Sequence, residues 1–121
     1  MNFLADALVL LVAALHAWFL VLEMFLWTKP IGLKTFSNTE ELARATATLA
    51  ANQGLYNGFL SAGLVWGLIA PSPGMALAVK TYFLACVVVA GTYGAWSVSR
   101  RIFFVQALPA IVALAAVWVL R

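Results

Sequence analysis

Four stretches of the chain are almost entirely apolar, and short polar segments separate them. The apolar stretches cover residues 3–27, 49–70, 75–98 and 102–120. Each is close to the roughly 20 residues that a helix needs to cross a hydrocarbon core about 30 Å thick. A membrane β-barrel would instead need about eight or more alternating segments of about 10 residues. The pattern therefore predicts an all-α protein, an integral membrane four-helix bundle that forms a single domain.

The polar segments predict where these helices begin and end. Residues 71–74 read Pro-Ser-Pro-Gly and break the chain between the second and third helices, and residues 99–101 do so before the fourth. The one long connection covers residues 28–45. Within it, Ser37 and Glu40 have the spacing of a capping box, and no Gly or Pro follows before Gln53. We therefore expect one helix from about 38 to 70 that extends beyond the membrane as an amphipathic stalk.

The composition indicates that lipid is the solvent of these helices. The chain is 65% apolar and 9% charged, whereas soluble domains are about 45–50% apolar and about 25% charged. The first stretch has no Lys or Arg before it and no A-x-A site after it, so we expect a helix of the mature protein and no cleaved signal peptide. The seven basic residues form no stripe, so no nucleic-acid partner is expected.

The positions of the basic residues predict the orientation in the membrane. The two loops on one side carry five of them, namely Lys29, Lys34, Arg44, Arg100 and Arg101. The other side carries only Lys80 and Arg121. Because Lys and Arg are retained in cytoplasmic loops, both loops are expected in the cytoplasm and both termini outside.

Several polar residues inside the apolar stretches are expected at one depth, near the cytoplasmic side. At about 1.5 Å of rise per residue, antiparallel helices bring these residues to a similar level. They are Glu23, Asn52, Gln53, Tyr93 and Gln106. His16 and Trp27 share a helix face with Glu23, and His16 lies about two turns deeper. Tyr56 and Asn57 follow Asn52 and Gln53 by one helical turn. We expect Glu23 to face the interior and bond to the second helix, with His16 lining the same cavity.

Each of these residues also has a purely structural interpretation. A carboxylate within a span is costly, with a penalty of roughly 2.5–3.5 kcal/mol for an Asp at the helix centre, and ionisable groups there are usually functional. Glu23 is off-centre, however, and a residue at that depth can instead extend toward the interface. His16 can be a neutral imidazole bonded between helices, and the carboxamides can serve as interhelical contacts. Lys80 is expected to extend outward toward Asp6, and Cys86 to be a small core residue.

Glycines on the second helix indicate close packing on two faces. Gly54 and Gly58 form a small-xxx-small pair that Ala62 continues, and Gly63 and Gly67 lie on a different face. Such grooves let another helix approach closely. Intramolecular packing is the simpler explanation, and a homo-oligomer contact is the alternative.

Two segments carry a resemblance to a known family. Residues 22–27 read LEMFLW and residues 49–59 read LAANQGLYNGF. Together with His16 they resemble the small bacterial membrane proteins of the domain of unknown function 1304 family. The resemblance covers the whole chain and implies a four-helix fold in the bacterial inner membrane, without an activity. It also implies that His16, Glu23, Asn52, Gln53 and Asn57 are the family's signature polar positions.

Three functions fit these polar positions. The first is a pocket that binds, and on one reading transforms, a small lipophilic ligand such as a quinone, sterol-like or isoprenoid molecule. Glu23 and His16 would then be the acid–base residues. The second is a partner or assembly subunit that contacts another protein or membrane lipid. The third is transport of a proton or small solute, although polar groups are scarce in the outer half. One His, one Glu and neutral amides are a poor zinc or iron shell, so neither a metal nor a cofactor is expected.

Overall fold

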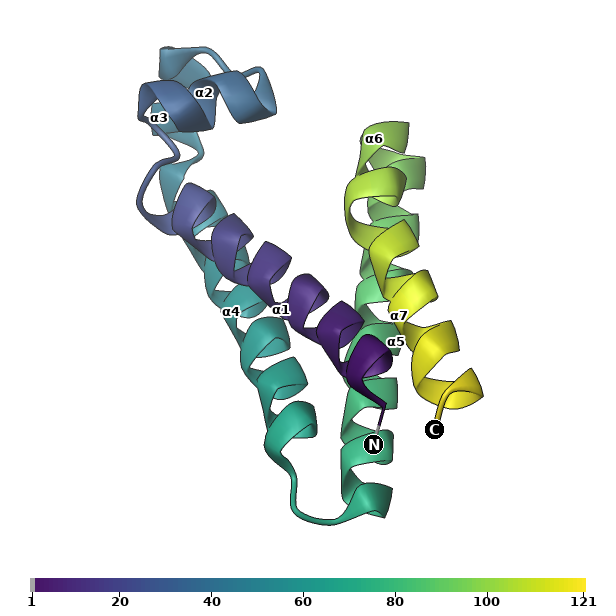
Figure 1. Ribbon diagram of the computed structural model, residues 1–121. Coiled ribbons are helices and arrows are strands. Elements are labelled where there is room, and N and C mark those ends of the chain that lie inside the picture. Colours follow the sequence, from purple (N-terminus) through teal and green to yellow (C-terminus); the bar gives the residue numbers. More distant parts are fainter. Residues whose placement is uncertain (1) are drawn as a thin grey trace. The chain divides into compact units, whose positions relative to one another are not determined.

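A computed structural model describes residues 2–121, and every regular element in that range is helical (Figure 1). The chain of residues 2–121 has no β-strand. The elements are α1 (Phe3–Met24), α2 (Pro30–Phe36), α3 (Glu40–Ala45), α4 (Ala47–Ile69), α5 (Pro73–Ser97), α6 (Arg100–Ile102), the π-helical turn η1 (Phe103–Ala107) and α7 (Leu108–Val119).

The chain divides into two compact units. Unit 1 contains Met1–Ala14 and Leu60–Arg121, and unit 2 contains Leu15–Phe59. Both boundaries fall inside helices, within α1 and within α4. Unit 1 therefore holds the first half of α1, the second half of α4 and everything after it. Unit 2 holds the remaining halves of these two helices together with α2 and α3.

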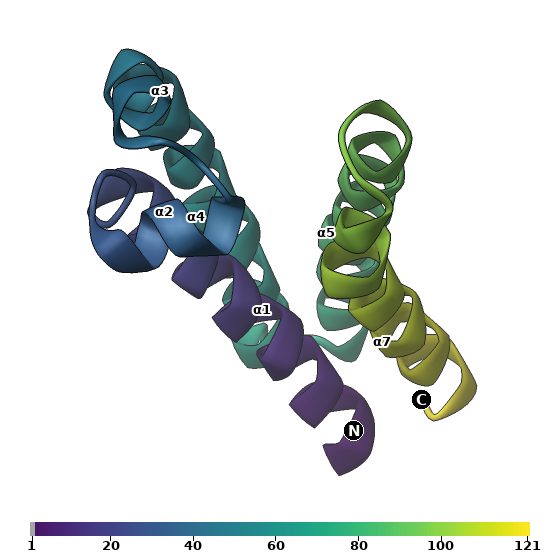
Figure 2. The ribbon, with the colours of Figure 1, turned by 90° about the horizontal axis from the view of Figure 1, so that it is seen from above.

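The C-terminal helices of unit 1 pack directly on one another. After the turn at Ser99, whose hydroxyl accepts a hydrogen bond from the Arg101 N–H, the chain runs back along α5 (Figures 1 and 2). A Cβ added at Gly91 of α5 would lie 2.7 Å from the backbone nitrogen of Ala107. The π-helical turn η1 precedes Pro109. Proline has no backbone N–H to donate, and its ring clashes with the carbonyl group four residues earlier in a regular α-helix. The close contact at Gly91 thus falls where the helix opposite is widened.

An ion pair joins the first half of α1 to α5 in unit 1. The Lys80 Nζ lies 3.0 Å from Asp6 Oδ1, and both side chains are largely shielded from solvent. Gly67 of α4 packs against the Lys80 backbone, where a Cβ would lie 3.1 Å from the Lys80 nitrogen. The expected approach of Lys80 to Asp6 is confirmed.

The glycines of α4 have the neighbours that their spacing predicts. In unit 2, a Cβ at Gly54 would lie 2.8 Å from Met24 of α1, and one at Gly58 would lie 2.6 Å from Leu20. In unit 1, a Cβ at Gly63 would lie 2.4 Å from the Phe83 ring of α5. The prediction that this helix packs closely on two faces is confirmed.

The expected loop of residues 28–45 is folded into two short helices, α2 and α3. Pro30 occupies the first turn of α2, where a missing N–H has no cost. Gly32 packs so tightly that a Cβ would lie 1.9 Å from the Leu26 carbonyl oxygen. The expected capping box is wrong, because Ser37 ends α2 with a φ of 54°, in the left-handed region. Thr39 caps α3 instead, since its side chain accepts a hydrogen bond from the Leu42 N–H.

The predicted continuous helix over residues 38–70 is also wrong. Helix α3 ends at Ala45, Thr46 has φ −109° and ψ 9°, and α4 begins at Ala47. The Thr46 hydroxyl donates a hydrogen bond to the Leu42 carbonyl at 2.8 Å and accepts one from the Trp27 indole. A threonine hydroxyl that bonds to the preceding turn commonly bends a helix. The break between α3 and α4 therefore falls at Thr46, whose side chain is hydrogen-bonded to Trp27, just beyond the end of α1.

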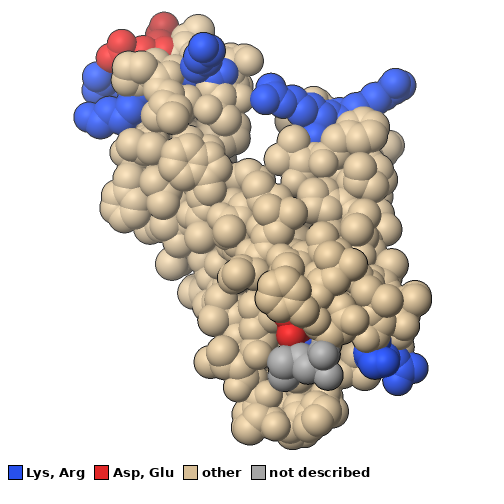
Figure 3. Space-filling model, in the orientation of Figure 1, with Lys and Arg blue, Asp and Glu red and all other residues tan. Residues whose placement is uncertain are grey.

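Three helical segments are long and apolar enough to cross a membrane, namely Phe3–Met24, Pro73–Ser97 and Arg100–Val119. Helix α4 has 23 residues but is not among them, because Asn52, Gln53 and Asn57 lower the hydropathy of its first half. Figure 3 shows Lys and Arg side chains near the helix ends and loops, with mostly uncharged surface between them. The four-helix membrane bundle and its orientation remain predictions, while the all-helical fold is shown.

The contact at Gly91 yields a stability prediction. We expect Gly91→Ala to lower the free energy of unfolding by about 1–3 kcal/mol, since the new methyl group would overpack a contact with backbone atoms. Gly74→Ala is the matched control, because a Cβ there would meet only Ser72 Oγ at 3.8 Å. The measurement is the unfolding of both purified variants in detergent micelles. Equal stability of the two variants would contradict the packing described.

Candidate functional site

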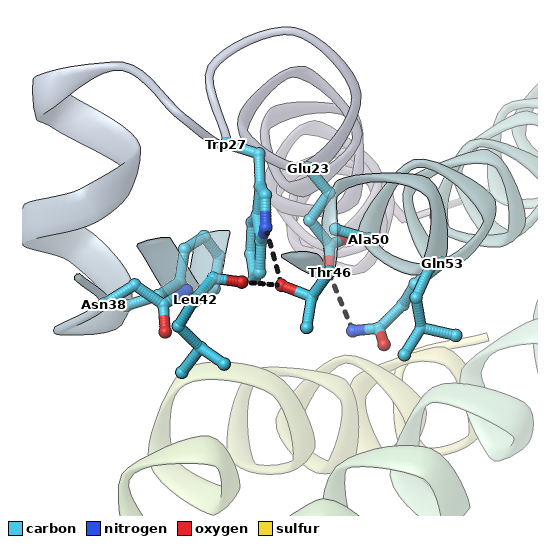
Figure 4. A pocket seen from close by; sticks show the side chains of 9 residues that line it. Glu23, Trp27, Asn38, Leu42, Thr46, Ala50 and Gln53 are labelled. Atoms are coloured by element: carbon cyan, nitrogen blue, oxygen red, sulfur yellow. Dashed lines mark hydrogen bonds between the residues drawn. The ribbon is translucent and has the colours of Figure 1, made fainter. Parts of the chain in front are cut away.

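A partly open pocket lies in unit 2, between the end of α1, the α2–α3 segment and the start of α4 (Figure 4). Its volume is about 320 Å³, near the lower end of the roughly 300–1,000 Å³ typical of small-molecule sites. The lining is mixed, with five apolar or aromatic residues and four polar ones. It consists of Glu23, Trp27, Phe36, Asn38, Leu42, Thr46, Leu49, Ala50 and Gln53.

The Glu23 carboxylate is the central polar group of this site. Its residue is 4% exposed, and it lies one residue before the end of α1. The Gln53 side-chain amide donates to Glu23 Oε2 at 2.7 Å, and the Asn57 amide donates to Oε1 at 2.5 Å. Each carboxylate oxygen therefore accepts one hydrogen bond from α4. These two bonds confirm that Glu23 faces the interior and binds the second long helix.

The local sequence of α4 explains how both amides reach one carboxylate. Gln53 and Asn57 are four residues apart, so they project from the same face of the helix. Gly54 and Gly58 follow each of them by one position and let the backbone of α4 come close to α1. A Cβ at Gly54 would lie 3.0 Å from the Glu23 Cβ. The small residues thus bring the amides within hydrogen-bonding distance of the carboxylate.

An aromatic pair forms one wall of the pocket. The rings of Trp27 and Phe36 lie 4.9 Å apart between centroids, with an interplanar angle of 48°. The Trp27 Nε1–H donates to Thr46 Oγ1 at 3.2 Å, as the dashed line in Figure 4 shows. Because this bond occupies the one donor of the indole, Trp27 presents only its ring to the cavity.

The structure brings together only part of the predicted site. Asn52 and Tyr56 are exposed on α4 and do not line the pocket. Tyr93, which is exposed, and Gln106, which is half-buried, belong to unit 1. The single polar layer that joins them to Glu23 remains a prediction.

The expectation that His16 lines the same cavity is wrong. His16 is fully buried, and its ring makes an edge contact with Phe19 at 5.1 Å between centroids. The pocket opens at the end of α1 toward α2 and α3, and His16 lies seven residues before Glu23 along the helix. His16 and Glu23 are separated by about two turns on the same face of α1, as expected. The pocket, however, extends from Glu23 toward the end of α1 and away from His16.

Several residues that line the pocket were not predicted as site residues, because they belong to the segment that was expected to be a loop or a stalk. They are Phe36, Asn38, Leu42, Thr46, Leu49 and Ala50. Two local signals predict the fold of this segment. Pro30 is typical of the first turn of a helix, and Thr39 before Glu40 and Glu41 is typical of a helix start. These signals mark the starts of α2 and α3, but they do not indicate that the two helices return the chain toward α1.

The chemistry available in the pocket is limited. Glu23 is the only Asp, Glu, His, Lys or Arg among the lining residues. Within residues 2–121, no group of three or more His, Cys, Asp and Glu side chains is arranged to hold a metal ion. The site can therefore accept hydrogen bonds or positive charge at Glu23, orient a ligand through amides, and bury apolar surface.

The fold and the site define a small all-helical protein with three helices apolar enough to cross a membrane and a buried carboxylate that lines a pocket. The chain belongs to the family described as "Protein of unknown function (DUF1304)", which matches residues 10–118. It is also similar to "Uncharacterized protein YpaA" of Lactococcus lactis subsp. lactis (strain IL1403), with 31% identity over 116 residues, 94% of this chain and 96% of the relative. No solved structure shows a significant match. The predicted family is confirmed.

The hydrogen bonds to Glu23 yield a prediction about the amides of α4. We expect Asn57→Ala to lower the free energy of unfolding by about 1–3 kcal/mol, because a buried carboxylate oxygen would lose its donor. Asn52→Ala is the matched control on the exposed face and should change it by less than about 0.5 kcal/mol. Reversible unfolding in detergent micelles measures both. If Asn52→Ala cost as much as Asn57→Ala, the assignment of the donors would be wrong.

Proposed function

We propose that unit 2 binds a small amphiphilic ligand in its pocket, with the Glu23 carboxylate as the anchor for the polar group of the ligand. The observation that carries the proposal is the position of this carboxylate. It is almost fully buried, yet it lines a pocket that is partly open. Buried charges in proteins are usually paired or serve a site, because their desolvation is costly.

The lining favours a ligand with an apolar body. Trp27, Phe36, Leu42 and Leu49 present apolar surface, and Leu49 is 70% exposed. Exposed apolar side chains around a cavity that contains a few polar groups are typical of small-molecule sites. Lipophilic molecules that carry one polar group, such as quinone, sterol-like or isoprenoid compounds, match this description.

A structural role alone accounts less well for the arrangement. Replacing a buried polar cluster with apolar residues of similar volume is often neutral or stabilising. A carboxylate held by two amides is therefore a poor device for merely joining α1 to α4. If the site catalyses a reaction, proton transfer by Glu23 is the chemistry that its lining offers, since no other acid or base lines it.

The pocket also suits a ligand that arrives from the lipid. Helix α1 is apolar enough to cross a membrane and ends at Met24, one residue after Glu23. The following segment carries Lys29 and Lys34, both exposed, which suit a membrane surface. We therefore propose that the site lies near the cytoplasmic boundary of the bacterial inner membrane, with both termini on the outer side.

The test compares what the protein retains when it is extracted in native lipid nanodiscs. Native mass spectrometry should find a small amphiphile on the wild type, and Glu23→Gln should reduce its occupancy about tenfold or more, because a charged acceptor is lost. The amide is nearly isosteric, so folding should be retained. Glu41→Gln is the control, since Glu41 is exposed and does not line the pocket. Identical occupancy in all three proteins, or none in any, would contradict the proposal.

A further inference from the structure

The acidic residues of the chain differ in how their charge is balanced. The chain has four of them, and two are in ion pairs. Glu40 lies 2.7 Å from the Arg44 guanidinium, and Asp6 lies 3.0 Å from Lys80. Glu41 is exposed. Glu23 is thus the one buried acidic residue that makes no ion pair within residues 2–121.

The two hydrogen bonds to Glu23 give each carboxylate oxygen a donor, but they do not balance the negative charge. Gln53 and Asn57 each donate one amide N–H, and both amides are neutral. An ionised carboxylate offers about four acceptor positions, so these two bonds leave acceptor capacity on each oxygen. No Lys or Arg lines the pocket. An anionic ligand would therefore meet an unscreened like charge, while a cation would supply the missing counter-ion.

The aromatic wall favours the same sign of charge. Aromatic faces carry negative partial charge and attract alkylammonium groups, most strongly where water is excluded. Trp27 and Phe36 line the pocket together with Glu23, and the indole N–H of Trp27 is already bonded to Thr46. A carboxylate beside aromatic rings, with apolar side chains around them, is complementary to a cation with an apolar body.

We infer that the ligand of this pocket is an alkylammonium ion, whose positive charge pairs with the Glu23 carboxylate beside Trp27 and Phe36. The inference rests on the proposed function, because it names the chemical class of the ligand for that same site. The ammonium group belongs either to a free lipophilic amine or to an aminophospholipid headgroup, since both present the same donor and charge.

The test is a titration of the full-length protein in neutral maltoside micelles with two probes that differ in charge. The probes are n-hexylammonium and n-hexanol, which have the same chain and both donate hydrogen bonds. Binding is followed through the indole ¹⁵N–¹H signals. The Trp27 signal reports on the pocket, and Trp118, whose indole is bonded to Thr81 in unit 1, is the internal control.

The expected result is a saturable shift of the Trp27 signal alone, with n-hexylammonium binding about 30-fold more tightly than n-hexanol. Glu23→Gln should remove this preference, and Glu41→Gln should keep it. Phe36→Leu should weaken n-hexylammonium more than n-hexanol, which keeps the inference testable if Glu23→Gln fails to fold. A third titrant, dihexanoylphosphatidylethanolamine, tests whether the ligand is an aminophospholipid or a free amine. Tighter binding than n-hexylammonium would identify the ligand as an aminophospholipid, and weaker binding would identify it as a free lipophilic amine.

Other outcomes overturn the inference and separate it from the proposed function. Equal affinity for the two probes, with both lost in Glu23→Gln, would refute a cationic ligand and leave an amphiphile site at Glu23. Saturable n-hexylammonium binding that Glu23→Gln does not change would place the cation elsewhere. No saturable shift with either probe would refute the alkylammonium class, and ligand retention in nanodiscs would then decide the proposed function by itself.

Discussion

The arrangement of unit 2 depends on one buried carboxylate and the two amides that bind it. Glu23 of α1 accepts hydrogen bonds from Gln53 and Asn57 of α4, and Gly54 and Gly58 allow the helices to come close enough for these bonds. Since a buried carboxylate needs donors, this contact constrains the register of the two helices. The pocket then forms where α1 stops and α2 and α3 return the chain over the start of α4.

The contact also links the composition of α4 to the chemistry of the site. The amides that satisfy Glu23 lower the hydropathy of α4, which is why this helix is less apolar than the three segments that can cross a membrane. In unit 1, by contrast, the Asp6–Lys80 ion pair supplies each charge with its partner. Within residues 2–121 Glu23 makes no ion pair, and under the proposed function its charge is the group that a ligand would bind.

The parts of the fold that depend on periodic patterns could be predicted from the sequence. Long apolar runs predicted the main helices, and matching depth predicted that Glu23 meets the start of α4, where Gln53 binds it. The four-residue spacing placed Asn57 on the same face as Gln53, but the bond from Asn57 to Glu23 was not predicted. The α2–α3 segment could not be predicted from those patterns, because short helices depend on single capping residues and on tertiary contacts. The Trp27–Thr46 bond and the Trp27–Phe36 contact are such contacts, and they join residues up to 19 positions apart.

The error about His16 has a related cause. Residues seven apart share a helix face, but a shared face does not determine which way a cavity extends. The end of α1 at Met24 and the return of the chain through α2 place the cavity beyond Glu23, away from His16. The direction in which the cavity extends depends on where the chain turns after α1, and the periodic pattern of a helix does not encode that position.

A double-mutant cycle between Glu23 and Asn57 measures whether their hydrogen bond stabilises the contact between α1 and α4. The free energy of unfolding is measured for Glu23→Leu, Asn57→Leu and the double variant, with a Glu23–Asn52 cycle as the control. If the Asn57 amide binds the Glu23 carboxylate, the coupling energy between them should be about 1 kcal/mol or more, as for a hydrogen bond to a charged group, and the effects of Glu23 and Asn52 should be additive. Additive effects in both cycles would contradict this hydrogen bond.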